Sequence, residues 1–230
     1  TATYTISGVN GETGATVGTI DVSGTTHTSA GTYNNDPWSF TGGANYNNQS
    51  GTVNDAIAKA DATVTVTAYS VTYNGAAHTA SYTISGVNGE TGATVGTIDV
   101  SGTTHTSAGT YNNDPWIFTG GANYNNQNGT VNDAIAKADA TVTVTGYSVT
   151  YDGAAHTATY TITGVNGETG ATVGTIDVSG TTHTNAGTYN GDAWSFTGGA
   201  NYNNQNGTVN DGITKATAVI TVTGFSGVYD

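Results

Sequence analysis

Polar and apolar residues alternate along short stretches of the chain, the pattern of strands with one buried face. Residues 62–67 read Ala-Thr-Val-Thr-Val-Thr, which places valine toward a core and threonine toward solvent. The pattern continues over 69–73, and Tyr73-Asn74-Gly75 is typical of a hairpin turn. Helix signals are nearly absent, so we expect an all-β chain. Further strands are predicted at 78–84, 97–100, 103–106, 108–111, 116–118 and 129–131.

The same pattern returns every 78 residues. Gly-Val-Asn-Gly-Glu-Thr-Gly stands at 8–14, 86–92 and 164–170, and residues 1–78 differ from 79–156 at only five positions. A period of this length predicts tandem domains rather than coils of a solenoid. Short strands separated by frequent turns favour a β-sandwich in each repeat, with an up-and-down barrel as the weaker alternative.

The domain boundaries are expected after the segment that ends in Lys-Ala. On this division 61–138 and 139–216 are complete domains, 1–60 lacks its first strand, and 217–230 supplies a first strand with no domain behind it. Only Gly-Ala-Ala-His is needed to carry the repeat from Asp230 back to the phase of Thr1. We therefore expect the tail to fit the gap at the head. The two would belong to neighbouring chains, or to flanking repeats of one longer polypeptide.

Composition excludes several classes of function. The 230 residues include 48 Thr, 34 Gly and 24 Asn, no Leu, no Cys, and three Lys against 16 acids, for a formal net charge of −13. Three cations cannot neutralise a run of phosphates, which argues against nucleic-acid binding. No apolar run is long enough for a membrane span. Without cysteine there are no disulfides, thiolate metal sites or cysteine nucleophiles.

The chain resembles the MBG domains ("mostly β, glycine-rich"), Ig-like repeats of bacterial surface and secreted proteins. Three stretches carry the resemblance: the opening 140–153 with His156 just beyond, the middle 101–111, and the closing part of the repeat from Asn123-Tyr124 to Ala138. The resemblance covers the whole chain. It implies tandem Ig-like β-sandwich domains in an elongated, adhesin-like array outside the cell, and it carries no catalytic residues.

Acids at the domain boundaries are the candidates for a metal site. Asp55 and Asp61 flank the first boundary, and Asp133 and Asp139 flank the second. Carboxylates at such junctions can hold Ca²⁺, although no Asp-x-Asp-x-Asp run accompanies them, and solvated surface acids are the alternative. The five histidines lack ligand spacing, so we expect packing roles for them and neither a catalytic site nor an enzyme.

Two further groups could contact or carry sugars. Sequons at Asn48, Asn128 and Asn206 are candidates for glycosylation. The Tyr/Asn-rich loops could present a tyrosine to a surface glycan: Tyr46, Tyr124 and Tyr202.

The leading hypothesis is a structural one: a repeat segment of an extracellular bacterial stalk, adhesin shaft or filament. Near-identical copies suit mechanical spacing better than distinct binding tasks. The C-terminal strand would complete the first domain of the next subunit by strand addition. The alternative is a carbohydrate- or surface-binding module that uses the Tyr/Asn loops.

Overall fold

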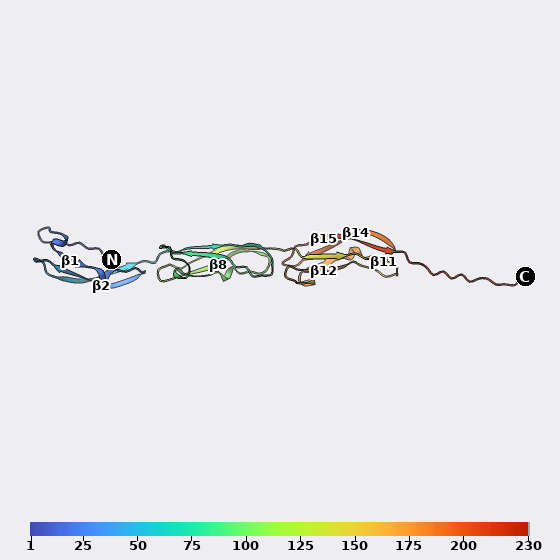
Figure 1. Cartoon of the computed structure of the whole chain (residues 1–230), viewed down its shortest axis with the longest axis horizontal. Coiled ribbons are helices and arrows are strands. Elements are labelled where there is room, and N and C mark those ends of the chain that lie inside the picture. Colours follow the sequence, from blue (N-terminus) through green and yellow to red (C-terminus); the bar gives the residue numbers. More distant parts are fainter. Residues whose placement is uncertain (230) are drawn as a thin grey trace. The chain divides into compact units, whose positions relative to one another are not determined.

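A computed structural model describes residues 1–229, in which short strands predominate and the only helical segments are single 3₁₀ turns (Figure 1). This confirms the all-β prediction. The strands are β1 (Gly18–Asp21), β2 (Gly31–Gly42), β3 (Gln49–Ile57), β4 (Thr63–Thr67), β5 (Ser70–Thr72), β6 (Ser81–Ser85), β7 (Gly96–Asp99), β8 (Gly109–Gly120), β9 (Gln127–Ala136), β10 (Thr141–Thr145), β11 (Ser148–Thr150), β12 (Thr159–Thr163), β13 (Gly174–Asp177), β14 (Gly187–Gly198) and β15 (Gln205–Thr214). The 3₁₀ turns are η1 (Gly14–Thr16), η2 (Ser23–Thr25), η3 (Gly92–Thr94), η4 (Ser101–Thr103), η5 (Gly170–Thr172) and η6 (Ser179–Thr181).

The chain divides into two compact units. The first comprises Thr1–Ala68, Thr79–Thr104 and Asn112–Asn132. The second comprises Tyr69–His78, His105–Tyr111 and 133–229. Each unit has a buried core of its own.

The second unit contains the complete strand set β10 to β15. β10 pairs antiparallel with β12, and a second sheet has the order β11-β15-β14-β13, in which β11 runs parallel to β15. Buried side chains from both sheets meet in one core, which includes Ile162 of β12 and Phe196 of β14. The valines of β10 are half-buried and its threonines exposed, as the alternation predicts.

The first unit contains a smaller sheet, β1-β2-β3, besides the pairs β4-β6 and β7-β8. Its buried core belongs to residues of the middle repeat, among them Ile84, Val95 and Phe118. The burial pattern of β4 is the same as that of β10, with alternate residues exposed.

Two local predictions are wrong. The turn at Tyr73-Asn74-Gly75 exists, with Gly75 at φ 78°, but it joins strands of different sheets, because β5 pairs with β9 and β6 with β4. The stretch predicted as a strand at 103–106 begins inside η4 instead. There the Thr103 hydroxyl donates to the Val100 carbonyl at 2.8 Å, a local bond that competes with strand pairing.

Substitution of two glycines of β15 by alanine is expected to change the stability in opposite directions. A Cβ at Gly207 would lie 2.5 Å from the Trp194 ring, whereas a Cβ at Gly212 meets nothing within 4 Å. Gly207→Ala is expected to lower the free energy of unfolding by about 1–3 kcal/mol through overpacking. Gly212→Ala, which restores the residue found at Ala134 of the middle repeat, should leave it unchanged or raise it slightly. Chemical denaturation of both variants checks this, and equal effects would contradict it.

Candidate functional site

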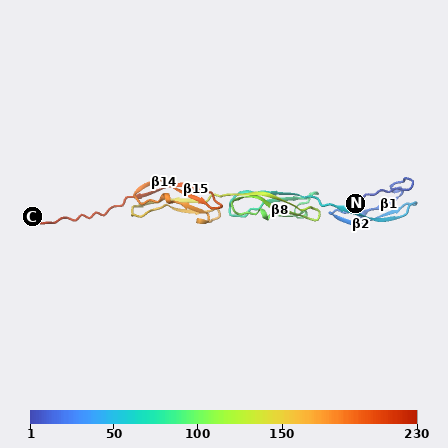
Figure 2. The same ribbon diagram turned by 180° about the vertical axis from the view of Figure 1, so that it is seen from behind.

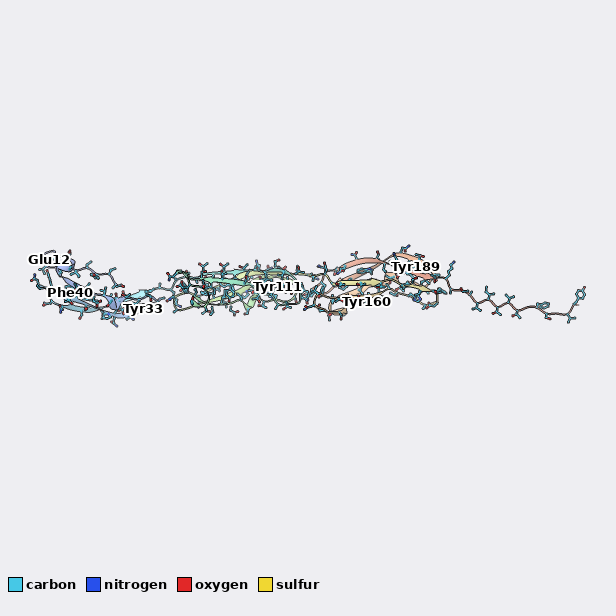
Figure 3. All side chains as sticks on the ribbon, viewed as in Figure 1. Glu12, Tyr33, Phe40, Tyr111, Tyr160 and Tyr189 are labelled. Carbon is cyan, nitrogen blue, oxygen red and sulfur yellow. The ribbon has the colours of Figure 1, made fainter. Side chains whose placement is uncertain are left out.

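The first repeat leaves part of its apolar interior uncovered, as a groove of about 410 Å³. Its lining includes Ile6, Val17, Trp38, Phe40 and Tyr46, of which Phe40 is labelled in Figure 3. These side chains come from the segment before η1, the link between η1 and β1, strand β2 and the loop between β2 and β3, and the lining also includes residues of β1 and β3. An apolar groove of this kind is a surface to which a further strand could add.

The third repeat shows what covers this face when the strand set is complete. There Ile162, the counterpart of Ile6, lies on a strand paired with β10, and Ile213, the counterpart of Ile57, lies beside β11. Ile213 is 3% exposed, whereas Ile57 is 37% exposed. Among residues 1–60 no strand takes the place of β10 or β11, and residues 1–6 form no strand themselves.

Apolar side chains with no partner follow β15. Residues 215–229 form no strand and are exposed along their whole length (Figures 1 and 2). Three of them stand at the repeat positions of Val142, Val144 and Tyr147, which help to form the third repeat: Ile220, Val222 and Phe225. Gly227 stands where the repeat has Val149, so the resemblance to β10 is stronger than the resemblance to β11.

The segment between β9 and β10 is short, and its two alanines are buried. Ala138 and Ala140 are part of the core of the second unit. The Ala138 N–H donates to the Asn201 carbonyl at 2.9 Å, and the Asn203 N–H donates to the Ala138 carbonyl at 2.9 Å. The Asn201 side chain also accepts the Ala108 N–H at 2.8 Å. This junction is therefore held by backbone bonds and a buried core, unlike a flexible linker.

The junction in the first unit repeats the same bonds. The Ala60 N–H donates to the Asn123 carbonyl and Asn125 donates to the Ala60 carbonyl, each at 2.9 Å. The Asn123 side chain accepts the Ala30 N–H at 2.8 Å. Two junctions with matching bonds indicate that the connection between repeats is specified by the sequence.

A β-bulge in β14 brings two aspartates to the same face. Tyr189 pairs with Asp211, and Asp192 pairs with Val209. The two residues between Tyr189 and Asp192 therefore both lie opposite Asn210. Gly191 takes φ 77°, and its N–H donates to the Asn210 side chain at 2.9 Å. In a regular strand, residues 189 and 192 would face opposite sides. The extra residue turns Asp192 to the side of Asp211.

A histidine completes this cluster. His183 Nε2–H donates to Asp192 Oδ2 at 2.8 Å, and its ring stacks on Tyr189 with centroids 3.5 Å apart and planes at 1°. Asp211 Oδ1 accepts the Tyr147 N–H at 2.9 Å. One ligand atom from each of His183, Asp192 and Asp211 lies within 4.8 Å of the others. The stacking and the backbone bond hold the imidazole and Asp211 in place.

One oxygen of this cluster is buried without a partner. Asp211 is 3% exposed, and its Oδ2 has no hydrogen-bond donor. Burial raises the pKa of the Tyr147 hydroxyl, and the negative charge of Asp211 raises it further. A buried carboxylate oxygen with no donor or cation costs free energy of folding. The cluster is thus a candidate site for a positively charged ligand.

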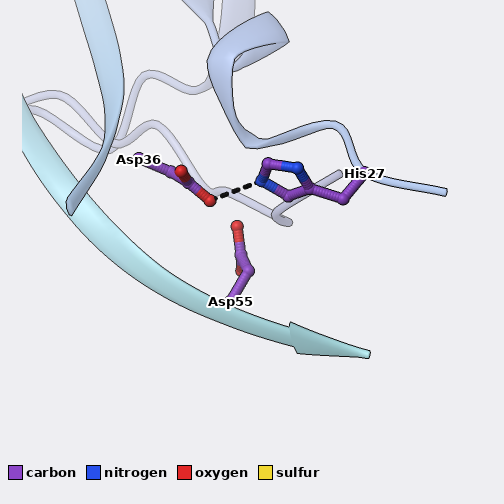
Figure 4. A group of neighbouring side chains, drawn as sticks. All are labelled: His27, Asp36 and Asp55. Atoms are coloured by element: carbon purple, nitrogen blue, oxygen red, sulfur yellow. Dashed lines mark hydrogen bonds and ion pairs between the residues drawn. The ribbon is translucent and has the colours of Figure 1, made fainter. Parts of the chain in front are cut away.

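The first unit has an equivalent cluster, shown in Figure 4. His27 Nε2–H donates to Asp36 Oδ2 at 2.6 Å, and Asp55 Oδ2 is buried without a partner. The bulge is again present, with Asn35 at φ 62°. In the sequence, the middle repeat has the same residue types at these positions, and Asp133 Oδ2 also lies buried without a partner.

The four aspartates predicted as calcium ligands lie in different environments. Asp55 belongs to the cluster in Figure 4, and Asp133 Oδ1 accepts the Tyr69 N–H at 2.9 Å. Asp61 and Asp139 each accept an asparagine side-chain amide at 2.8 Å in their junctions. The acids of each predicted pair therefore have different partners.

The tyrosines predicted to contact a glycan have structural partners. Tyr124 and Tyr202 are 2% exposed, and their hydroxyls accept the N–H groups of Val87 and Val165 at 3.1 Å. Tyr46 is half-buried at the groove. In the described structure a sugar could not stack on the two buried rings.

The predicted glycosylation sites lie on the surface. Asn48, Asn128 and Asn206 are exposed. Asn128 and Asn206 lie at the start of β9 and β15, and Asn48 directly precedes β3. All three side chains are accessible to a modifying enzyme.

No protein-family model matches the sequence, and no curated protein matches it either. Within residues 1–229 there is no helix with the length and apolar character of a membrane span.

Sequence reasoning missed Asp36 and Asp192 as partners of a histidine. The signal was an aspartate nine residues after the histidine of Thr-Thr-His-Thr and another aspartate nineteen residues further on. These intervals are the same in all three repeats (27, 36, 55; 105, 114, 133; 183, 192, 211). These intervals match no ligand motif, because the bulge and the strand pairing, which the sequence does not show directly, bring the residues together.

One loop glutamate in each repeat accepts a hydrogen bond from a tyrosine hydroxyl. Tyr46 donates to Glu12 Oε2 at 3.1 Å. In the third repeat Tyr73 donates to Glu168 Oε1 at 3.1 Å and packs edge-on against Tyr202. Bonds from the backbone N–H of Glu168 and of Asn166, with the two tyrosine hydroxyls, hold the Glu168 pKa below its ordinary 4.5, although desolvation opposes them.

Because the pKa values of these glutamates are lowered in the folded state, we expect the protein to lose stability in acid. A folded-state pKa below the unfolded value contributes stability above about pH 4.5, and this is lost as pH falls through the lowered pKa. The triple variant Glu12→Gln, Glu90→Gln, Glu168→Gln is therefore expected to be less stable at pH 7 and to lose less stability between pH 5 and 2. Urea titration across this range measures both. Parallel pH curves for the variant and the wild type would contradict the prediction.

Asp211→Asn is expected to stabilise the protein when divalent cations are chelated. The change removes an unpartnered buried charge and keeps the acceptor for the Tyr147 N–H, so the free energy of unfolding should rise by about 1–2 kcal/mol. The matched control is Asp177→Asn, an exposed aspartate whose Oδ1 accepts the Ser179 N–H, which should lose a little stability. Denaturation in EDTA compares them, and a less stable Asp211→Asn protein would refute the assignment of an unpaired charge.

Proposed function

We propose that the chain is a structural segment of a bacterial extracellular stalk, adhesin shaft or filament, built from Ig-like β-sandwich repeats. The observation that carries the proposal is the pairing of an uncovered core with an exposed strand-like segment. The groove of the first repeat lacks the strand that β10 provides in the third. Residues 218–225 carry the apolar side chains of that strand and pack against nothing.

In the proposed contact, residues 218–225 of one molecule add to the first repeat of the next. The third repeat is the template: Ile220 and Val222 would occupy the positions of Val142 and Val144, opposite the Ile6 segment. A head-to-tail contact between different surfaces does not close on itself, so it produces a fibre. A preceding repeat of the same polypeptide could supply the same strand in cis, and the experiment below separates the two sources.

The gain from burying the apolar side chains is of the same order as the cost of association. Burying Ile220, Val222 and Phe225 contributes about 1.5–3 kcal/mol each. Association costs about 4–15 kcal/mol in lost translational and rotational freedom. Backbone hydrogen bonds along the added strand would add to this gain. Because the two terms nearly balance, we expect assembly to depend on concentration.

The junctions support a mechanical role. Both connections use the same asparagine bonds, so the spacing between repeats is set by specific contacts. Tandem units of this kind suit a shaft that holds something else at a distance. The extracellular location rests on the resemblance to MBG domains of bacterial surface proteins.

The proposal predicts concentration-dependent fibres of the 230-residue chain. Ile220→Asp with Val222→Asp places two charges on the face that would enter the groove and is expected to abolish assembly. The matched control is Val219→Asp with Thr221→Asp, because these residues stand at the exposed positions of β10, and it should still assemble. Light scattering and electron microscopy measure the result.

Two outcomes would overturn assembly between chains. One is a wild-type chain that stays monomeric at every concentration tested, which would leave only a strand supplied in cis. The other is equal assembly of both double variants, which would place the contact elsewhere. A synthetic peptide of residues 217–229 provides a further check, since it should cap the groove and shorten the fibres.

A further inference from the structure

We propose that the cluster of His183, Asp192 and Asp211 is a binding site for a divalent transition-metal ion of the Zn²⁺ class. The cluster offers one imidazole nitrogen and two carboxylate oxygens, which lie within 4.8 Å of one another. Zn²⁺ is bound by His nitrogen and Asp oxygen, and three protein ligands with a water in the fourth position is an established arrangement. The inference does not depend on fibre formation.

The unpartnered oxygen is the observation that points to a ligand. Asp211 is 3% exposed, its Oδ1 accepts the Tyr147 N–H, and its Oδ2 accepts no hydrogen bond although it lies in the cluster. Without a cation the two carboxylates accept one ring N–H and one backbone N–H, and neither donor bonds Asp211 Oδ2. A divalent ion would meet the free Oδ2 and balance both negative charges.

The distances fit a small ion with little rearrangement. Tetrahedral ligands about 2.0–2.1 Å from Zn²⁺ lie about 3.3 Å apart. His183 Nε2 and Asp192 Oδ2 are now 2.8 Å apart and share a proton, so they must separate by about 0.5 Å and release that proton. The stacking of the imidazole on Tyr189 already sets the plane of its ring.

The donor set selects against calcium. Ca²⁺ takes six to eight oxygen ligands, whereas this cluster supplies two carboxylates and a nitrogen. Imidazole with carboxylate suits Zn²⁺ and its neighbours in the first transition series. This places the metal in a cluster within the repeat, away from Asp61 and Asp139 at the junctions.

The same site recurs in the first unit. His27 donates to Asp36 and stacks on a tyrosine ring, as the histidine does in the third repeat, and Asp55 has the same unpartnered oxygen (Figure 4). In each case the three residues come from two neighbouring strands and the loop before the first of them. A bound ion would tie these three segments together and stabilise the repeat against unfolding.

The test uses the full 230-residue chain, stripped with a chelator and titrated with ZnCl₂. NMR of the imidazole nitrogens is expected to show Zn²⁺-induced shifts for His27 and His183. His78 and His156 serve as internal controls because their Nε2 atoms contact Asn74 and Asp152 in exposed turns. X-ray absorption of the bound zinc should show one histidine nitrogen among oxygen ligands. Equal shifts at all histidines, or zinc without a histidine ligand, would overturn the proposal.

Variants give a second, independent measurement. Asp55→Asn, Asp133→Asn and Asp211→Asn together are expected to weaken zinc binding at least tenfold in equilibrium dialysis and to remove its effect on the melting temperature. Asp21→Asn, Asp99→Asn and Asp177→Asn change the net charge equally, at exposed aspartates whose Oδ1 atoms each accept a serine N–H, and should bind zinc as the wild type does. Equal loss in both triple variants would mean diffuse attraction to surface acids and would overturn the site.

Discussion

The core of each repeat depends on the alternating Val/Thr strand that precedes the rest of its strands. In the third repeat β10 pairs with β12, the strand that carries Ile162, and β11 lies beside Ile213. Where no such strand is present, the first repeat shows the cost: residues 1–6 do not form a strand and Ile57 is partly exposed. A domain of about 60 to 80 residues has little apolar surface to spare, and in the first repeat Val17 and Phe40 remain buried while Ile57 is partly exposed.

The bulge in β14 shows a second constraint, which concerns the placement of charged side chains and not the packing of the core. In a regular strand Asp192 would point to the opposite face from Asp211, and the two side chains would not meet. The bulge instead gathers two acids and a histidine on one face, with one oxygen unsatisfied. The local geometry depends on a residue that tolerates positive φ, Gly191 in one repeat and Asn35 in another. The geometry of the cluster therefore depends on the bulge residue as well as on the His and Asp side chains.

The sequence predicts the strands best where their period is regular. The Thr-Val-Thr-Val-Thr runs appear as β4 and β10 with the expected burial. It predicts poorly where side chains bond to nearby backbone, as at Thr103, or where a turn leads from one sheet to another, as at Gly75. The His–Asp–Asp clusters could not be predicted from spacing, because residues 9 and 19 apart meet only after a bulge shifts the register.

The short connection between β9 and β10 also has a consequence for how the chain folds. Residues 63–67 and 141–145 are identical, so either could cover either core, and near-identical neighbours invite exchange of strands during folding. Only four residues separate Ala136 from Thr141, which gives the correct strand a high effective concentration at its own core. The short connection therefore favours pairing of each strand with its own core during folding. Side-chain complementarity alone could not distinguish the equivalent strands, because their sequences are identical.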